Sequence, residues 1–351
     1  MAATSKVYGI ILAGGQGSRM GSGHIPKSLQ QIANFPLLGY VYDAMKQAGI
    51  TRHISVISPQ YQAVFEEEMA DIAPNMKYAH QPKPLGTADA VKHALKKLPK
   101  TAEKLVIIFG DTPFLRPATI RNMLKSKADI GILAFRPKET LAYGRVVMGA
   151  DKIPQKIVEH KHATPEEKKI NLCNGGAIFA KRKVLERLLK KVNNKNKSKE
   201  YYLPDCIGLA HAEKRKIGLI MGQEEEMLGV DSPQMLAQAE LIMQKQLRKK
   251  AWRKGVVMVE PNHVSFAYDT KFRGSAQIEP FVIFGRGVSI GEGVRVRSFS
   301  YIEGSRLEAG AEIGPHARLR GESVIRKGAR IGNFVEVKNA RIGAGVKAGH
   351  L

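Results

Sequence analysis

The hydrophobic residues in the first two-thirds of the chain fall into short runs, with amphipathic segments between them. The runs span residues 7–12, 54–57, 106–109, 130–134, 177–179 and 217–220. Apolar runs of this length predict strands that are buried on both faces. Because segments such as 37–49 and 87–98 have helical periodicity, we expect an α/β domain with a mainly parallel sheet. Ligands of such sheets bind beyond the carboxyl ends of the strands.

A long polar helix is predicted after this domain. Ser232 is a suitable N-cap, and Pro233 fits the first helical turn. The helical pattern continues to about residue 254, so we interpret residues 232–255 as a connector.

The pattern changes again from about residue 276, where aliphatic residues recur about every six positions. They are Val282, Val288, Val294, Ile302, Leu307, Ile313, Leu319, Val324, Ile331, Val337 and Ile342. Gly-x-Gly sequences at 285–287, 291–293 and 343–345 punctuate them. This hexapeptide repeat predicts a β-helical solenoid, with an ordinary β-rich domain as the alternative. We therefore expect domains at 1–231 and 256–351 on either side of the connector, the second one truncated because the repeat is still running at Leu351.

Composition agrees with a protein of two domains. A chain of 351 residues exceeds the size at which single cores stop growing, and its 43% hydrophobic content is ordinary for globular proteins. We find no apolar run long enough to span a bilayer and no signal-peptide pattern, so we expect no membrane insertion. Cys173 and Cys206 form no metal-spaced pair, which favours reduced thiols and a cytoplasmic location.

The chain is strongly basic, with a formal net charge of +24. Such an excess attracts polyanions and raises the question of nucleic acid. The densest basic tract, residues 190–199, contains no aromatic residue that would stack on bases. We interpret it as a solvated loop, expect no nucleic-acid partner, and regard the excess as suited to anionic substrates.

The strongest candidate for chemistry is the glycine-rich segment that follows the first apolar run. Gly14, Gly15 and Gly17 let the backbone approach a ligand, so that successive N–H groups cradle phosphate oxygens. Arg19 and Lys27 follow within reach of the same anion. The segment lacks the Gly-Lys-Ser/Thr of a P-loop and the third small residue of a dinucleotide fingerprint. It therefore predicts a different polyphosphate site, with a glycine turn that binds nothing as the alternative.

A carboxylate is predicted at the same edge of the sheet. Asp111 comes directly after the apolar run 106–109. Mg²⁺ takes few protein carboxylates together with phosphate oxygens and water, so Asp111 is a candidate ligand. The alternative is that it only forms a turn.

These motifs carry a resemblance to a known family. Residues 12–15 (Leu-Ala-Gly-Gly), 17–20 (Gly-Ser-Arg-Met) and 26–29 (Pro-Lys-Ser-Leu) resemble the signature of sugar-1-phosphate nucleotidyltransferases, which implies a Rossmann-like domain. Such a domain followed by a helix and hexapeptide repeats resembles the bifunctional N-acetylglucosamine-1-phosphate uridylyltransferase/glucosamine-1-phosphate acetyltransferases. Further runs that carry the resemblance are residues 143–145, 157–161, 200–202, 332–336 and 347–351.

The resemblance implies that UTP and N-acetylglucosamine-1-phosphate react to UDP-N-acetylglucosamine and pyrophosphate, for peptidoglycan and lipopolysaccharide precursors. The sugar phosphate is already an anionic nucleophile, so positioning and charge neutralisation carry the catalysis. It also implies a left-handed β-helix, a homotrimer, and acetylation of glucosamine-1-phosphate by acetyl-CoA. We expect this second activity to be lost, because the family's β-helix continues beyond Leu351.

Roles for individual residues are implied by the same resemblance. Arg19 and Lys27 would act on the phosphates, and Asp111 and Asp231 would bind Mg²⁺, Asp231 standing where the family has Asn. Alternatively, Asp231 only caps the connector helix. The residues implied in UTP binding are Leu12, Ala13, Gly14, Gly15, Lys27, Gln81, Gly86 and Thr87. Those implied in sugar binding are Gly144, Glu159, Asn174 and Asp231. For acetyl transfer, Arg320 and Lys338 would bind the acceptor and His350 would be the general base.

Two other functions stay open from the sequence. The glycine segment is shared among nucleotidyltransferases, so another sugar phosphate or another nucleotide is possible. A non-catalytic, basic trimeric scaffold is the alternative from a different class of protein.

Overall fold

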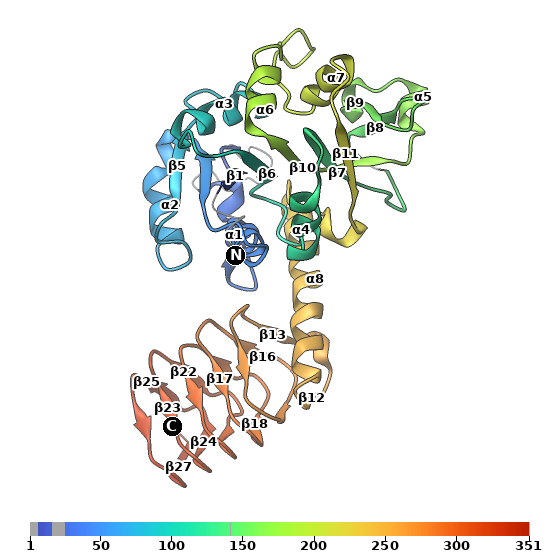
Figure 1. Cartoon of the computed structure of the whole chain (residues 1–351). Coiled ribbons are helices and arrows are strands. Elements are labelled where there is room, and N and C mark those ends of the chain that lie inside the picture. The colour runs from blue at the N-terminus through green and yellow to red at the C-terminus, as the bar shows by residue number, and fades with distance from the viewer. Residues whose placement is uncertain (1–5, 16–24, 141, 351) are drawn as a thin grey trace. The chain divides into compact units, whose positions relative to one another are not determined.

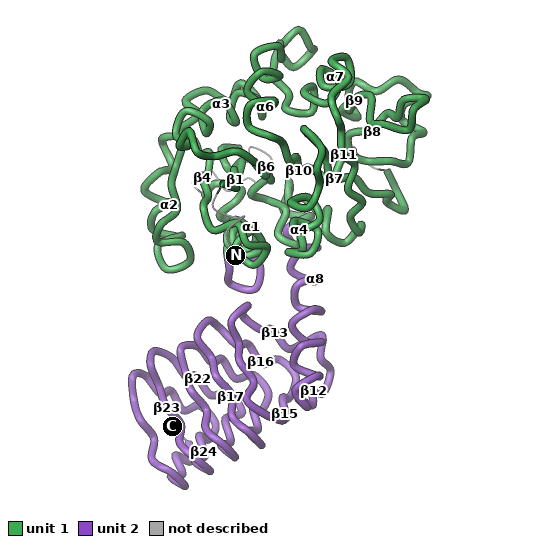
Figure 2. The backbone as a smooth tube through the Cα atoms, viewed as in Figure 1, with its two compact units in different colours: residues 1–30, 36–235 green, residues 31–35, 236–351 purple. Residues whose placement is uncertain are grey.

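The computed structural model describes residues 6–15, 25–140 and 142–350. The chain forms two compact units, one within residues 1–30 and 36–235 and the other made of residues 31–35 and 236–351 (Figure 2). In the described part of the chain, no helix combines the length and the apolar character that a membrane span requires.

The first unit is built on a mixed sheet. Its main strands run in the order β11-β7-β10-β6-β1-β4-β5, and β8 and β9 extend it beside β10 (Figure 1). The bounds are β1 (Val7–Leu12), β4 (His53–Ile57), β5 (Lys77–His80), β6 (Lys104–Phe109), β7 (Ile130–Phe135), β8 (Arg145–Met148), β9 (Pro154–Val158), β10 (Cys173–Lys181) and β11 (Ile217–Met221). The central strands β6, β1, β4 and β5 are parallel, so their carboxyl ends meet at one edge.

The predicted apolar runs all lie in strands of this sheet, and the expected Rossmann-like α/β class is confirmed. The run 177–179 is the middle of the longer strand β10, which is antiparallel to both β6 and β7. Apolar character indicates burial and not strand direction, so the hydrophobic pattern could not predict that β10 is antiparallel. Strand β5, in which only Ala79 is fully buried, was not predicted.

Helices cover both faces of the sheet and complete two separate apolar cores. One core includes Val91 of α3, Leu185 of α6 and Ile207 of α7. The other includes Val41 of α1, Phe65 of α2 and Ile120 of α4. The helix bounds are α1 (Leu37–Gln47), α2 (Gln62–Met69), α3 (Thr87–Lys97), α4 (Pro117–Lys125), α5 (Pro165–Lys168), α6 (Arg182–Leu189) and α7 (Asp205–Ala212).

The predicted connector is the helix α8 (Pro233–Trp252). Ser232 caps it, because the Ser232 hydroxyl accepts a hydrogen bond from the backbone N–H of Met235 at 3.2 Å. The short hairpin of β2 (Gln31–Ile32) and β3 (Phe35–Pro36) is joined to the part of α8 in the second unit, where the Glu240 carboxylate accepts from the N–H of Ala33.

The rest of the second unit is a β-helix, as the repeat predicts, and it is left-handed, as the family resemblance implies. Three parallel sheets run in the orders β12-β15-β18-β21-β24-β27, β13-β16-β19-β22-β25 and β14-β17-β20-β23-β26. The strands are β12 (Val256–Met258), β13 (Val264–Phe266), β14 (Lys271–Phe272), β15 (Ala276–Ile278), β16 (Val282–Phe284), β17 (Ser289–Ile290), β18 (Val294–Val296), β19 (Tyr301–Ile302), β20 (Arg306–Leu307), β21 (Glu312–Ile313), β22 (Arg318–Arg320), β23 (Val324–Ile325), β24 (Arg330–Asn333), β25 (Glu336–Lys338), β26 (Arg341–Ile342) and β27 (Lys347–His350).

The hexapeptide positions fill the interior of this β-helix. Val282 pairs with Val264 one coil earlier, and Val294, Ile302 and Leu319 are buried in successive strands. Of the recurring aliphatic residues, Val324 is an exception: Val324 is partly exposed and Ile325 is the buried residue of that strand. Side chains alternate between the faces of a strand, so a shift of one residue exchanges inside for outside.

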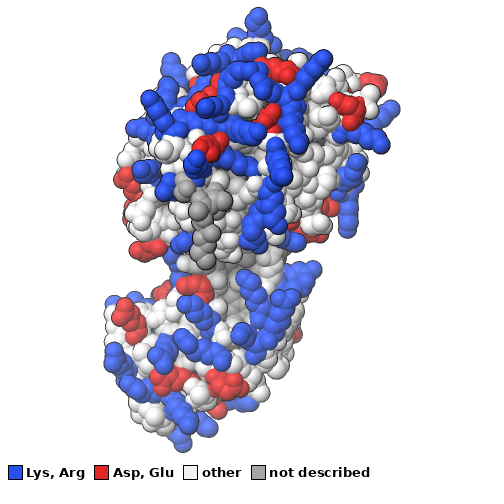
Figure 3. Space-filling model, viewed as in Figure 1, with Lys and Arg blue, Asp and Glu red and all other residues white. Residues whose placement is uncertain are grey.

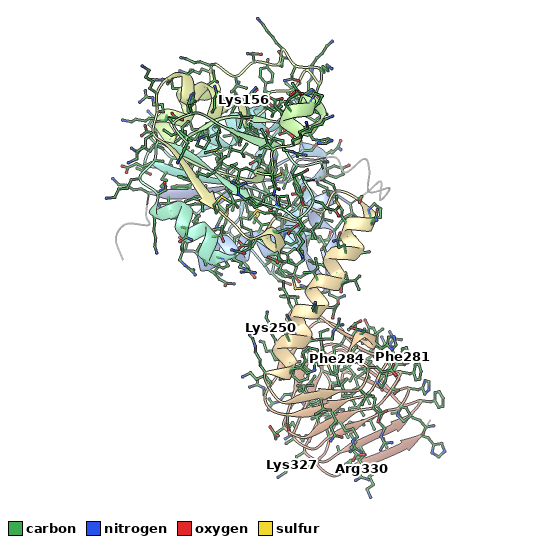
Figure 4. The ribbon with its side chains drawn as sticks, turned by 90° about the vertical axis from the view of Figure 1, so that its right-hand side faces the viewer. Lys156, Lys250, Phe281, Phe284, Lys327 and Arg330 are labelled. Carbon is green, nitrogen blue, oxygen red and sulfur yellow. The ribbon has the colours of Figure 1, made fainter. Side chains whose placement is uncertain are left out.

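An aromatic ladder follows one corner of the β-helix. It consists of His263, Phe281, Phe299, His316 and Phe334, whose stacked rings lie 4.6–5.1 Å apart from centroid to centroid. The last four have positive φ angles of 54–61°, and all five are exposed. Phe281 points outward from the coils in Figure 4. The ladder was not predicted, because φ > 0 is uncommon for residues of this size.

Candidate active site

The glycine segment leaves the end of β1 at the edge where the parallel strands finish. The N–H of Ala13 donates to the carbonyl of Val56, and the N–H of Gly110 donates to that of Leu12, both at 2.9 Å. These bonds fix the segment between the ends of β4 and β6. A cavity of about 280 Å³ opens there. All the residues predicted to bind UTP line it, together with Asp111.

Lys27 lies at the polar end of this cavity, between two carboxylates. Its ammonium donates to Asp231 Oδ1 at 2.5 Å and forms an ion pair with Asp111. Burial by itself lowers the pKa of Lys27, but the two carboxylates outweigh it, so the pKa of Lys27 is raised. Lys27 is therefore a fixed positive charge at the place where the sequence predicted a phosphate.

Asp111 follows β6, and its side chain is only 14% exposed. Burial raises the pKa of this carboxyl, and Asp231 adds to the rise while Lys27 opposes it. Two carboxylates that converge on one cation form a donor set that a hard divalent ion accepts. The described residues contain no cluster of three or more His, Cys, Asp or Glu suited to a metal, so the remaining ligands would have to be phosphate oxygens and water.

A backbone contact brings Asp231 to this place. The N–H of Val230 donates to the carbonyl of Asp111 at 3.0 Å. Just upstream, the carboxylate of Glu226 is buried and accepts hydrogen bonds from the Thr119 hydroxyl at 2.6 Å and the Arg116 N–H at 3.1 Å. Glu226 thus anchors the segment before Asp231 to the start of α4. Because Ser232 is the cap of α8, the alternative that Asp231 only caps this helix is wrong.

The opposite end of the cavity is formed by Gln81 and the start of α3. The Gln81 amide nitrogen donates to the carbonyl of Gly86 at 3.0 Å and to Asp89 at 2.9 Å. Gly86 has φ 110°, and a Cβ there would lie 2.5 Å from the backbone oxygen of Tyr201, so only glycine fits. The Thr87 hydroxyl accepts from the N–H of Leu203, which ties α3 to the same segment as Tyr201.

Three of the four residues predicted to bind the sugar, Gly144, Glu159 and Asn174, form a group that does not line this cavity, whereas the fourth, Asp231, contacts Lys27. The N–H of Asn174 donates to the carbonyl of Gly144 at 2.8 Å, and a Cβ on Gly144 would lie 3.6 Å from the Glu159 carboxylate. Burial raises the pKa of Glu159, and the charge of Glu200 adds to the rise while Lys161 opposes it. Burial, with Glu159 nearby, also raises the pKa of Asp205 to about 6.

The other predicted site residues lie elsewhere. Arg19 is outside the described residues. Arg320, Lys338 and His350 belong to the second unit, where Arg320 pairs with Lys338 across neighbouring strands and donates to Glu336 at 2.5 Å. Sequence reasoning missed Glu200, which lines the cavity, although it begins the run 200–202. Glu226 and Asp89 were also missed, and no local signal marks them.

Comparison with known proteins agrees with this geometry. The chain matches the family described as the MobA-like NTP transferase domain over residues 9–197. It is 37% identical to the bifunctional protein GlmU of Hyphomonas neptunium over 314 residues, which are 89% of this chain and 68% of that protein. It is 38% identical to GlmU of Azorhizobium caulinodans over the same length, which is 89% of this chain and 69% of that protein. With GlmU of Sphingopyxis alaskensis the identity is 37% over 350 residues, which are 98% of this chain and 76% of that protein.

A Rossmann-like sheet with a glycine-lined cavity that holds Lys27 and Asp111 at its carboxyl edge, followed by a β-helix, defines a nucleotidyltransferase with a hexapeptide-repeat domain. Such enzymes act on a nucleotide and a sugar phosphate with a divalent metal ion. The chain belongs to the family of the bifunctional protein GlmU. This assignment confirms the expected uridylyl transfer from UTP to N-acetylglucosamine-1-phosphate. The product, UDP-N-acetylglucosamine, is a precursor for cell-wall synthesis.

Proposed function

We propose that the cavity at the end of β1 is where uridylyl transfer takes place. The observation that carries the proposal is the arrangement of Lys27 between Asp111 and Asp231 beside a glycine-lined pocket. Gly14 and Gly15 leave room for the triphosphate, and the Lys27 ammonium neutralises its charge. Arg19, four residues after Gly15, is proposed to act on the same phosphates.

Mg²⁺ is the proposed metal, held by Asp111 and Asp231. When bound, it would neutralise charge on the phosphates and align the reacting oxygens. Lys27 holds both carboxylates in place, because one oxygen of each contacts its ammonium. The second carboxylate strengthens the attraction for a divalent cation, since an Asp brings a full charge where an amide brings none.

Selection of the base is proposed to depend on Gln81. Since its amide nitrogen is engaged by Gly86 and Asp89, the carbonyl oxygen is left to accept a hydrogen bond from the ligand. Uracil carries a donor at N3, whereas cytosine carries an acceptor there, so an accepting Gln81 favours UTP. Gly144, Glu159 and Asn174 are proposed to hold the sugar and its acetyl group.

The experiment is a matrix of four nucleoside triphosphates against several sugar-1-phosphates, with release of pyrophosphate as the readout. We expect UTP with N-acetylglucosamine-1-phosphate to exceed every other pair by at least about a hundredfold in kcat/KM, the scale on which buried polar groups discriminate. Equal rates with CTP would contradict the role of Gln81. Equal rates with glucose-1-phosphate would contradict the sugar group around Asn174.

For the second unit, we propose that Arg320 and Lys338 form a site for the phosphate of an acetyl acceptor, with His350 as the base. The supporting observation is that Arg320 and Lys338 are cross-strand neighbours in β22 and β25. Calorimetric titration with glucosamine-1-phosphate tests it, and unchanged affinity in Lys338→Ala would contradict it. We also propose a homotrimer, to be measured by light scattering, and a cytoplasmic location, which the two buried free thiols support.

A further inference from the structure

A second cavity, of about 420 Å³, lies entirely within the second unit, between the last turns of α8 and the first coil of the β-helix. None of the residues assigned above to uridylyl or acetyl transfer lines it. Figure 4 shows Lys250 on the last turns of α8, above the coil in which Phe284 points inward. The cavity is therefore separate from both proposed sites.

Four cations line this cavity: Lys250, Arg253 and Lys254 near the end of α8, and Lys271 on β14. No Asp or Glu is among the lining residues. Within the described part of the chain, none of the four side chains forms an ion pair. Positive charges gathered around one concavity repel one another, and an anion bound among them relieves that repulsion. The dense charge indicates a ligand with more than one negative charge.

The floor of the cavity is apolar. Leu247, Ala251 and Phe266 are buried there. Phe272 packs edge-on against Phe266, with ring centroids 5.5 Å apart, and is itself only partly buried. A site that combines a few charged groups with an apolar and aromatic lining is typical of small organic ligands, and simple ions need no such floor.

The cavity exists because the end of the β-helix is only partly covered. Gln244 of α8 covers β13, since its amide exchanges hydrogen bonds with the backbone of Phe266 at 2.7 and 2.9 Å. The hairpin covers Tyr268, whose ring stacks on Phe35 at 3.8 Å. Strand β14 is the end strand of its sheet and is paired with β17. An end strand presents backbone donors and acceptors to whatever lies beside it.

We propose that this cavity binds a nucleoside polyphosphate, with the phosphate chain among the four cations and the planar base against the apolar floor. Thr270 is also among the lining residues, and its hydroxyl is shielded from solvent and has no hydrogen-bond partner among the described residues. The proposal does not rest on the function proposed for the first unit.

Trp252 provides the readout. It is the chain's one tryptophan and stands in α8 between the lining residues Ala251 and Arg253. We would titrate the full chain with ATP and follow Trp252 fluorescence, with calorimetry as a second measurement. In Lys250→Ala/Lys271→Ala we expect the affinity for ATP to fall at least about tenfold, with uridylyl transfer unchanged. Lys245→Ala is the matched control, because Lys245 is exposed on the same helix but does not line the cavity.

Three results of the ATP titrations would overturn the proposal. They are the absence of saturable ATP binding, an equal loss of affinity in Lys245→Ala, and loss of ATP binding in Lys27→Ala, which would place ATP in the first unit. Inorganic triphosphate and adenosine test the two halves of the ligand. We expect each to bind at least about tenfold more weakly than ATP. If inorganic triphosphate binds as tightly as ATP, the cavity is a plain anion site and the nucleotide assignment is wrong.

Discussion

Lys27 Nζ lies 2.5 Å from Asp231 Oδ1, although 204 residues separate the two in the sequence. The contact joins the segment after β1 to the segment before α8, which are the two ends of the nucleotidyltransferase domain. The site is therefore complete only when the whole domain has folded. The Lys27 ammonium lies against both carboxylates that are proposed to hold the metal, so its charge and that of the metal would act on the same phosphates.

Replacing Asp111 tests the metal site. We expect Asp111→Asn to lower kcat for uridylyl transfer at least about a hundredfold, because one charged ligand of the metal is lost while the side-chain shape is kept. The measurement is pyrophosphate release over a range of Mg²⁺ concentrations. Asp129→Asn is the control, since Asp129 forms an ion pair with Lys181 away from the cavity. Full activity of Asp111→Asn at saturating Mg²⁺ would contradict the assignment.

Replacing Lys27 tests the charge between the carboxylates. In Lys27→Ala we expect turnover to fall at least about a hundredfold, the scale for removing a preorganised charge contact. The Asp111 carboxyl also loses the cation that opposes the rise of its pKa, so the acidic limb of the pH–rate profile should move to higher pH. Lys6→Ala removes an exposed ion pair with Glu103 and should leave the turnover and the pH–rate profile unchanged. An unshifted pH–rate profile would contradict a role for the Lys27–Asp111 ion pair.

Glu226 is expected to act through position. Glu226→Ala leaves the Thr119 hydroxyl and the Arg116 N–H without their acceptor in a buried place, which should lower the free energy of unfolding by about 1–3 kcal/mol. Because Glu226 anchors the segment before Asp231, the Mg²⁺ concentration for half-maximal rate should rise as well. Urea denaturation and Mg²⁺ titration measure the two effects. Glu225→Ala, which changes an exposed neighbour, should alter neither the free energy of unfolding nor the Mg²⁺ requirement. Equal effects of Glu225→Ala and Glu226→Ala would refute the positioning role of Glu226.

Gly86 is expected to tolerate no side chain. In Gly86→Ala a Cβ would lie 2.5 Å from the oxygen and 2.7 Å from the nitrogen of Tyr201, at a φ of 110°. Gly328→Ala is the control for backbone strain alone, since Gly328 has φ 66° and a Cβ there meets nothing within 4 Å. Left-handed strain costs about 1–2 kcal/mol, so Gly86→Ala should lose clearly more stability than Gly328→Ala and should raise the KM for UTP. Similar losses in both variants would show that α3 moves freely away from Tyr201.

Acid should destabilise the first unit through His53. Burial lowers the pKa of His53 to about 4, from an ordinary value of 6.5 in the unfolded chain. The folded state holds this ring neutral, so the unfolded state takes up a proton first and stability is lost as the pH falls from 6.5 towards 4. Between about pH 7.5 and about pH 5 we expect a loss of about 2 kcal/mol that is absent in His53→Phe. Parallel pH dependence in both proteins, measured by urea denaturation, would exclude His53 as the source.

Local pattern was sufficient for much of this architecture and for part of the site. Buried strands and the hexapeptide interior are marked by apolar spacing, and the cavity at the end of β1 follows from Gly14 and Gly15 beside a cation. The reversal of β10 was not predictable, because apolar residues look alike in parallel and antiparallel strands. Glu226 looks like an ordinary surface carboxylate in the acidic run 224–226, and only the fold shows that it is buried.

The aromatic ladder also constrains how the length of the β-helix changes during evolution. Its five rings recur once per coil, and each keeps its place only because its neighbours stand at the same corner. The coil from Phe299 to His316 is one residue shorter than the coils beside it, and the residue is missing from the turn between β19 and β20, so the stack is kept. An insertion inside a strand, by contrast, would send an interior residue to the surface. Gain or loss of a whole coil would leave every ring with an equivalent neighbour. We therefore expect the domain to change in length by the gain or loss of whole coils.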